Sequence, residues 1–329
     1  MNELFRTPVG IEKLKQPIDH SHKVTMIGSC FSENIYRKLK EYRFNVICNP
    51  NGVLYNPLSI TAVLDRLLQK KTYIKEDLFF HNDLWMSFDH HSTFNHTDDK
   101  LCLQKINSGF LSAETFLKNT DLLMLTFGSA FVYQLSENNK VAANCHKLPE
   151  SKFIRRLASV DEIVSSCCDI FNKLRQANPA LNILLTVSPV RHLRDKAHEN
   201  TVSKSHLIAA VYRLENIFER VYYFPSFEIM MDELRDYRFY ASDMIHPSDT
   251  AIEFLWNRFR QFCISKSSNE FIERYERIIA ARAHRIMFPG TAAAKEFANS
   301  QIRTLDALKD GFPLIDLSAD YEWFRNLSK

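Results

Sequence analysis

Short apolar runs alternate along the chain with stretches in which apolar residues recur every three or four positions. Runs of the first kind are typical of strands buried on both faces, and the second pattern is typical of the amphipathic helices that cover such strands. The runs predict strands at residues 24–27, 44–47, 121–128, 182–189 and 221–226. Strands separated by helices indicate an α/β fold, with a parallel sheet of about five strands and helices on both faces.

The predicted helical stretches alternate with these strands along the chain. The first predicted strand leads into a stripe formed by Phe31, Ile35 and Leu39. The stretch Ser159 to Glu162 has the spacing of a capping box, which opens a helix. Beyond residue 263 only the helical pattern remains. We therefore expect an α/β domain over residues 1–263, with an insertion and a small hairpin at about residues 73–103, and a helical C-terminal extension over residues 264–329.

Composition and charge narrow the class of protein. The net charge is only +3, and Lys and Arg form no stripe, which disfavours nucleic acid as a partner. No apolar run approaches the roughly 20 residues of a membrane-spanning helix. The first residues carry acidic side chains and no apolar signal segment, so we expect a cytoplasmic protein. Seven cysteines, an odd number with no CxxC pair, argue against a disulfide framework.

The residues just after each predicted strand form the candidate site, because ligands bind beyond the carboxyl ends of strands in an open parallel sheet. They provide nucleophiles, small backbone positions, cations and an imidazole with a carboxylate. These residues are Gly28, Ser29, Cys30, Gly52, Gly128, Ser129, Arg191, His192, Asp243 and His246. A nucleophile, an imidazole and a carboxylate on one edge are the groups that acyl transfer needs.

The spacing of Asp243 and His246 allows two interpretations. On a loop that runs into a helix, Asp-x-x-His can place the carboxylate against one imidazole nitrogen while the other faces a nucleophile. Alternatively, the two residues only stabilise the start of the next helix. In the same way, Arg191 and His192 either bind a carboxylate or phosphate of the substrate or belong to a charged surface loop.

Cofactor sites are not indicated by the sequence. His81, His90, His91 and His96 crowd one segment, but they lack the spacing and the flanking carboxylates of a metal site, so we expect no metal. No glycine-rich phosphate-binding motif is present, which disfavours nucleotide-dependent chemistry.

Six motifs in order resemble a known family. They are "IGSCFS", "NGVLYNP", "FGSAFVY", "ANCHK", "SPVRHLRD" and "DMIHPS", and together they are similar to the GSCFA-domain family within the SGNH/GDSL hydrolase group. The resemblance runs from about residue 4 to residue 256 and extends weakly into the helical tail. It departs from the name motif at Ser32, where the family name has alanine.

The resemblance implies a flavodoxin-like sheet and assigns roles to several residues. Asp243 and His246 would form the late catalytic block, and the main-chain N–H of Gly52 would help to hold the oxyanion. The group carries an asparagine donor where this chain has Ala130. Ser129 or Asn144 would replace that donor, and His146 lies beside Asn144 in the same loop motif. Loss of one such donor costs roughly 3 kcal/mol of transition-state stabilisation.

Two adjacent residues compete for the role of nucleophile. Alignment of the glycine of "IGSCF" with the glycine of the Gly-Asp-Ser-Leu motif puts Cys30 at the nucleophile position and Ser29 at the aspartate position. A shift by one residue restores a serine but misplaces the glycine. A thiol at a helix N-terminus is expected to have a lowered pKa, because the first amides and a nearby imidazole favour the thiolate.

The leading hypothesis is an SGNH-like hydrolase or acyltransferase that acts on an ester, with an O-acylated carbohydrate or a cell-envelope precursor as the implied small-molecule or glycan substrate. It would need no cofactor, and a transferase would use acetyl-CoA or another acyl donor. The alternative is an inactive SGNH-fold protein that binds a glycan, an acyl ligand or a protein partner, and Ala130 favours this alternative.

Overall fold

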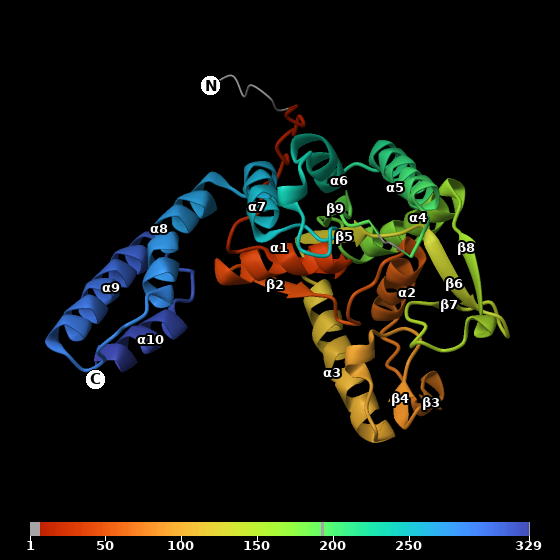
Figure 1. Ribbon diagram of the computed structural model, residues 1–329, viewed down its shortest axis with the longest axis horizontal. Coiled ribbons are helices and arrows are strands. Elements are labelled where there is room, and N and C mark those ends of the chain that lie inside the picture. The colour runs from red at the N-terminus through yellow and green to blue at the C-terminus, as the bar shows by residue number, and fades with distance from the viewer. Residues whose placement is uncertain (1–6, 192–193, 329) are drawn as a thin grey trace.

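The computed structural model describes residues 7–191 and 194–328, and a parallel sheet of five strands lies at its centre (Figure 1). The strand order across the sheet is β10–β9–β5–β1–β2, and each neighbouring pair is parallel. The strands are β1 (Lys23–Gly28), β2 (Asn45–Cys48), β5 (Leu122–Phe127), β9 (Asn182–Val187) and β10 (Val221–Tyr223). The predicted α/β fold with a five-stranded parallel sheet is confirmed.

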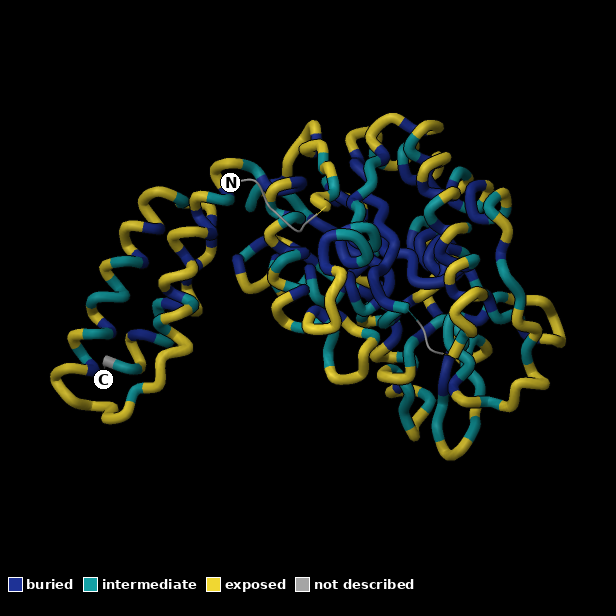
Figure 2. The backbone as a smooth tube through the Cα atoms, turned by 45° about the horizontal axis from the view of Figure 1, so that its top comes forward, coloured by how far each residue is buried: buried dark blue, intermediate teal, exposed yellow. Residues whose placement is uncertain are grey.

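Alternate side chains of each strand point to opposite faces, and each face has its own core. Val24 and Met26 of β1 pack with one set of helices, whereas Leu123 and Leu125 of β5 pack with the other. The first set contains α1 (Cys30–Glu41) and α7 (Asp249–Cys263). The second contains α2 (Pro57–Leu68), α3 (Asp99–Leu117), α4 (Val160–Ala177) and α5 (Ala197–Ile217). Figure 2 shows that buried residues concentrate in this middle region.

Polar side chains cap these helices as the sequence predicts. The Ser159 Oγ accepts a hydrogen bond from the Glu162 N–H at 3.1 Å and opens α4. The Ser248 Oγ accepts one from the Ala251 N–H at 3.4 Å and opens α7. Each cap satisfies one of the N–H groups that the first turn of a helix leaves unpaired.

Smaller elements extend from the sheet. The predicted hairpin between residues 73 and 103 is confirmed, because β3 (Phe79–His81) pairs antiparallel with β4 (Leu84–Met86). A second antiparallel sheet was not predicted; it contains β6 (Phe131–Leu135), β7 (Val141–Ala142) and β8 (Phe153–Leu157). Short turns complete the chain: η1 (Lys75–Asp77), η2 (Ser92–Phe94), η3 (Glu150–Lys152), α6 (Ser226–Glu228), η4 (Ile229–Glu233) and η5 (Tyr237–Phe239).

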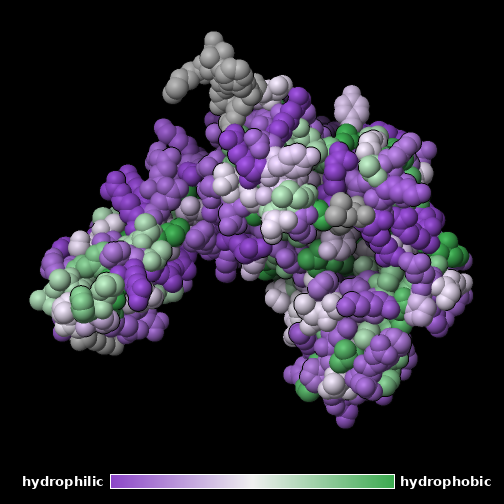
Figure 3. Space-filling view, in the orientation of Figure 1, coloured by the Kyte–Doolittle hydropathy of each residue, from purple (hydrophilic) through white to green (hydrophobic). Residues whose placement is uncertain are grey.

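The C-terminal part forms an arm of three helices, which projects to one side of the sheet in Figure 1. These are α8 (Lys266–Ala283), α9 (Ala292–Gly311) and α10 (Ser318–Ser328). The buried Asp320 carboxylate joins the arm to the rest, because it accepts hydrogen bonds from Arg43 (2.7 Å), Tyr275 (2.8 Å) and Arg282 (2.7 Å). Figure 3 shows a mainly hydrophilic face with hydrophobic residues on the outer part of the arm. Within the described ranges, no helix is both long and apolar enough to cross a bilayer.

Candidate functional site

The turn after β1 packs closely against the end of β5. Gly28 has a φ of +151°, and a Cβ added there would lie 2.3 Å from the carbonyl oxygen of Thr126. The next residue, Ser29, donates its N–H to the same carbonyl at 3.2 Å. A side chain at position 28 would therefore force the two strand ends apart, which explains the glycine in the motif.

The two candidate nucleophiles have different environments. The side chain of Ser29 is the N-cap of α1: its Oγ accepts the Phe31 N–H at 3.4 Å, and the residue is only 1% exposed. Cys30 is the first residue of α1 and is partly exposed. Of the two side chains, only the Cys30 thiol combines access from outside with a position at the helix N-terminus.

The expected direction of the Cys30 pKa is wrong. Burial raises the pKa of the thiol, and the nearby Glu33 carboxylate raises it further. The main-chain N–H groups of Cys30 and Phe31 and the ammonium of Lys204 act in the opposite direction, but their effect is smaller. Desolvation of the thiolate therefore outweighs the helix N-terminus. A thiol in this state needs a base at the moment of attack.

Asp243 and His246 form a direct carboxylate–imidazole pair. The imidazole Nδ1 and the Asp243 Oδ2 are 2.6 Å apart, and the Asp243 Oδ1 accepts the N–H groups of Ile245 (2.9 Å) and His246 (3.0 Å). These hydrogen bonds, led by that from the His246 main chain, lower the pKa of Asp243 to about 2. Since the cap of α7 is Ser248, the pair is not needed to start that helix.

Two neighbouring helices follow the turn at residues 28–30 and the Asp243–His246 pair in the chain. α1 packs against α7, with Lys38 paired to Glu253 at 2.5 Å and Tyr42 stacked on Trp256 at 5.6 Å between ring centroids. The two pairs have nearly the same sequence separation, so the helices run side by side in the same direction. Both helices therefore begin at the same end of the pair, α1 after the turn at residues 28–30 and α7 after the Asp243–His246 loop. No hydrogen bond joins His246 to Cys30 or Ser29 among the described residues.

Sequence reasoning missed Lys204, which holds two strand ends together. Its Nζ donates hydrogen bonds to the carbonyl oxygens of Gly128 (2.8 Å), after β5, and Ser188 (2.7 Å), after β9. The side chain is fully buried, and burial, followed by the charge of Arg191, lowers its pKa to about 7. The missed signal was a lysine on the apolar stripe of a helix, three residues before Leu207.

The predicted oxyanion donors are largely engaged elsewhere. The N–H of Gly52 donates to Asn49 O at 2.8 Å, so it is not the open donor that the resemblance implies. The N–H groups of Gly128 (2.7 Å) and Ser129 (2.9 Å) both donate to Tyr55 O, and the Ser129 Oγ accepts a main-chain N–H at 3.1 Å. Ala130, at the position of the missing asparagine, is fully buried.

Tyr55 is a further residue at this edge. Its ring and its carbonyl oxygen lie against Gly128, where an added Cβ would be 3.2 Å from both and 3.5 Å from the Ser29 Cβ. Burial, then the neighbouring Cys30 and Glu33, raises the pKa of the tyrosine hydroxyl. Its hydroxyl therefore stays protonated at neutral pH and is a donor. The motif "NGVLYNP" contains Tyr55, but its pattern does not single out this residue.

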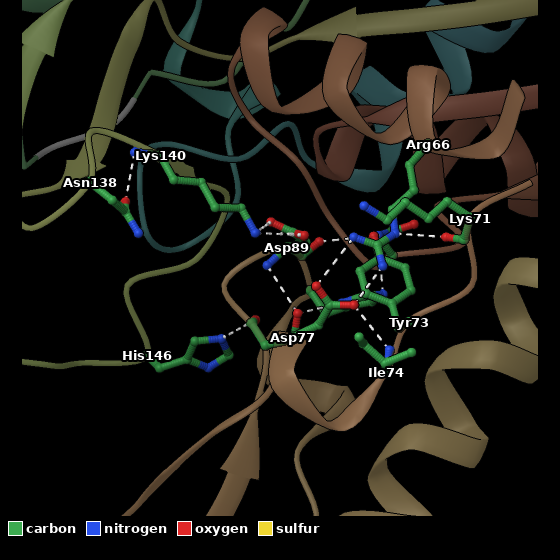
Figure 4. A network of polar contacts seen from close by, with 12 residues as sticks. Arg66, Lys71, Tyr73, Ile74, Asp77, Asp89, Asn138, Lys140 and His146 are labelled. Atoms are coloured by element: carbon green, nitrogen blue, oxygen red, sulfur yellow. Dashed lines mark hydrogen bonds and ion pairs between the residues drawn. The ribbon is translucent and has the colours of Figure 1, made fainter. Parts of the chain in front are cut away.

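Asn144 and His146 lie away from the turn at residues 28–30, and Figure 4 shows His146 in a network of polar contacts around the insertion. The Asn144 Oδ1 accepts the His146 N–H at 2.8 Å, and the imidazole Nε2 lies 2.8 Å from the carbonyl oxygen of Ser87. Burial lowers the pKa of His146. The His146 side chain thus contacts the insertion, and the Asn144 side chain binds the His146 main chain. Neither has a hydrogen bond to the described turn at residues 28–30, contrary to the oxyanion role expected of Asn144.

Arg191 lies at the end of β9. Its guanidinium is 3.2 Å from the Thr201 hydroxyl and 5.5 Å from the centre of the Phe227 ring. The neighbouring candidate, His192, falls outside the described residues. Across the part of the chain that the structure describes, no three His, Cys, Asp or Glu side chains gather as a metal site.

Solved structures with a similar chain course are carbohydrate esterases. The "Clostridium thermocellum family 3 carbohydrate esterase" is 10% identical, with coverage of 73% of this chain and 94% of that chain and a TM-score of 0.35. A carbohydrate esterase family 3 structure from Talaromyces cellulolyticus is also 10% identical, with 78% and 99% coverage and a TM-score of 0.34. An acetyl xylan esterase from the rumen bacterium Butyrivibrio proteoclasticus is 11% identical, with 74% and 64% coverage and a TM-score of 0.36.

Family models identify the chain where individual proteins do not. No curated protein matches it. The model of the GSCFA family matches residues 23–259, which include the turn at residues 28–30 and the Asp243–His246 pair. The model described as "GSCFA domain protein, C-terminal domain" matches residues 275–328 in the helical arm. The chain therefore belongs to the GSCFA family.

Proposed function

We propose that this protein is an ester hydrolase or acyltransferase in which Cys30 is the nucleophile, His246 the general base and Asp243 the residue that orients the imidazole. The observation that carries the proposal is the Asp243–His246 pair at 2.6 Å, on a loop that precedes a helix running parallel to α1. Ser29 fits the role of nucleophile less well, because its hydroxyl is buried as a helix cap.

The raised pKa of Cys30 determines how the reaction would begin. His246 Nε2 takes the thiol proton as the sulfur attacks the acyl carbon, and a thioester forms when the C–O bond of the ester breaks. The alcohol leaves with the proton held by the imidazolium. Water, or an acceptor hydroxyl in a transferase, then gives up a proton to His246 and attacks the thioester, which releases the acyl group and restores the thiol.

Other groups would support these steps. Asp243 remains a carboxylate at neutral pH because its pKa is about 2, so it can stabilise the imidazolium. The main-chain N–H of Cys30 would help to hold the oxyanion, since the N–H groups of Phe31 and Ser32 are bound to Ser29. No cofactor is required for hydrolysis, and transfer would need acetyl-CoA or another acyl donor. The resemblance favours an O-acylated carbohydrate or cell-envelope precursor as substrate.

A second candidate function is binding without catalysis. It is favoured by the engaged N–H groups of Gly52 and Ser129 and by the apolar residue at Ala130. Such a protein would use the same candidate site to hold a glycan, an acyl ligand or a protein partner.

The test combines turnover of short-chain nitrophenyl esters with intact mass measurement of the protein. We expect a covalent acyl adduct on the native chain, its loss in Cys30→Ala, and a decrease of about 100-fold or more in kcat for His246→Ala. Cys48→Ala is the matched control, since Cys48 is another partly exposed cysteine at a strand end, and it should behave as the native protein. Activity that survives Cys30→Ala but disappears in Ser29→Ala would contradict the choice of nucleophile. No turnover and no adduct with any ester or with acetyl-CoA, together with retained glycan binding, would favour the binding protein.

A further inference from the structure

A cavity of about 460 Å³ opens beside the Asp243–His246 loop. The two residues between the aspartate and the histidine, Met244 and Ile245, form part of its wall. The other lining residues are mostly apolar or aromatic: Arg191, Met230, Met231, Leu234, Arg235, Asp236, Tyr237 and Tyr240. The volume falls in the range of roughly 300–1,000 Å³ that is usual for small-molecule sites.

The apolar wall is built by an unusual turn. The segment Ile229–Glu233 is a single turn of π-helix, closed by the Leu234 N–H, which donates to Ile229 O at 3.2 Å. Met230, Met231 and Leu234 all line the cavity. A π turn is rare and occurs often at functional sites, because it costs stability and persists where it places side chains usefully.

Another part of the cavity wall, at Met244, also has a sparsely populated backbone conformation. Met244 has a φ of +58°, which is uncommon for a residue with a side chain. Its N–H donates to Ala241 O at 2.9 Å, and the N–H of His246 is held by Asp243. The side chain of Met244 is 58% exposed beside the cavity. This loop thus presents an apolar side chain to solvent next to the imidazole, where a ligand would cover it.

The charged side chains at the rim of the cavity differ in whether they have an ion-pair partner. Arg235 is bound by Asp232 at 2.9 Å, and Asp236 lies 3.6 Å from Arg238. Arg191 contacts the Thr201 hydroxyl at 3.2 Å, and it forms no ion pair with any of the described residues. A cation without a carboxylate partner at the edge of an apolar cavity favours a ligand that carries negative charge.

We propose that this cavity binds an amphipathic anion: an apolar chain or ring that lies against the methionine and tyrosine side chains and carries one carboxylate or phosphate, which pairs with Arg191. Thioether and aromatic walls adapt to the shape of such a body. Ile245 of the cavity wall is adjacent to His246 in the chain. The inference therefore rests on the proposed function, and it identifies the part of the substrate that lies next to the reacting ester. Binding itself requires no catalysis.

Calorimetric titration of the full chain tests this with four probes: octanoate, octyl phosphate, 1-octanol and acetate. We expect the preferred octyl anion to bind about tenfold more tightly than 1-octanol, as one charged hydrogen-bonded pair allows, and acetate to show no binding. The stronger of octanoate and octyl phosphate identifies the anionic group. Equal binding of 1-octanol and both anions would overturn the proposal.

Variants test separately how the Arg191 charge and the apolar wall contribute to binding. Arg191→Met should remove the preference for the anion but keep the binding of 1-octanol, whereas the matched Arg235→Met, whose side chain is already paired, should retain the preference. Met244→Glu, at an exposed position, should weaken octyl binding about tenfold or more. An unchanged preference in Arg191→Met would overturn the inference. Anion binding by a protein without esterase activity would refute only the proposed function, and esterase activity without anion binding would refute only this inference.

Discussion

At the scale of single residues, Lys204 is the most unusual group at the candidate site. A fully buried lysine is rare unless it is paired with a carboxylate, yet the hydrogen bonds of its Nζ are made to two carbonyl oxygens. Those oxygens belong to the ends of two neighbouring strands, and Gly128 also lies against Ser29. Lys204 thus joins the ends of β5 and β9 beside the turn that leads to Cys30.

The stability of the protein should depend on pH through this residue. Lys204 has a pKa of about 7 in the folded protein against 10.5 for an unperturbed lysine, so the unfolded chain binds more protons between these values. The penalty for the buried charge is complete below pH 7 and disappears as the pH rises toward 10.5. From pH 7 to pH 9, the free energy of unfolding should therefore increase by on the order of 2 kcal/mol relative to Lys204→Met.

Urea unfolding of the native chain and of Lys204→Met at both pH values measures this difference. Lys118→Met, at an exposed position, is the control and should follow the native protein. A difference between native and Lys204→Met that is the same at pH 7 and pH 9 would contradict the assignment of the low pKa to Lys204.

At this scale, a contact can be predicted from the sequence when the residues that form it are close together in the chain. The contact between Asp243 and His246 could be expected, because three residues of loop suffice to form it. The direction of the Cys30 pKa could not, because it is decided by the amount of protein that covers the thiol. Lys204 lies on an apolar stripe that predicted a helix correctly, and the stripe gave no reason to look for a charge on it.

At the scale of elements, the insertion supports the loop after β2. Gly52 has a φ of +78°, and a Cβ there would lie 2.3 Å from the Cβ of His91. Asn51 O accepts the His91 N–H at 2.8 Å, and the Asn51 amide nitrogen lies 3.1 Å from the imidazole of His90 and 3.2 Å from the Tyr73 hydroxyl. Burial lowers the pKa of His90 to about 3, so it remains neutral in this network.

Gly52→Ala should therefore be more destabilising than an ordinary glycine substitution. The left-handed backbone costs roughly 1–2 kcal/mol, and displacement of His91 adds at least about 1 kcal/mol. Gly290→Ala is the matched control, because Gly290 has a φ of +82° and no atom within 4 Å of an added Cβ, so it bears only the first cost. Thermal or urea unfolding compares them, and equal losses would mean that the insertion does not press on this loop.

Elements with a regular pattern were predictable and the others were not. The order of strand and helix in the main sheet follows from continuous apolar runs and from helical stripes. The strand Phe153–Leu157 contains two adjacent arginines and is only partly buried, so its pattern does not indicate a strand. Its partner strands are likewise short, and their pairing depends on contacts between distant parts of the chain.

At the scale of the whole molecule, the Asp320 carboxylate is one of several contacts between the arm and the α/β body, together with His20–Ser268 at 2.9 Å and Arg260–Glu276 at 3.4 Å. Asp320 is fully buried between Arg43, which follows α1, and Tyr275 and Arg282 of α8. Both arginines are partly exposed, at 23% and 39% of their side chains. The carboxylate therefore has three partners from two regions and holds the arm in place.

Asp320→Asn should loosen this junction. The loss leaves two guanidinium groups without their counter-charge, and we expect a cost of about 2 kcal/mol, below the roughly 3–5 kcal/mol of fully buried pairs because water reaches both arginines. Glu296→Gln, in an exposed pair with Arg303 on the same arm, should cost under about 0.5 kcal/mol. Urea unfolding measures both, and limited proteolysis should detect earlier cleavage in the arm of Asp320→Asn alone. Equal stability of the two variants would contradict this role of Asp320.

The position of Asp320 also bears on the order of folding during synthesis. Arg43 has a φ of +67° in the turn that joins α1 to β2, and its guanidinium is held by a residue 277 positions further along the chain. The first crossover of the sheet thus receives this contact only after the ribosome has made α10. A premature stop codon before α10 would remove a contact of that first crossover.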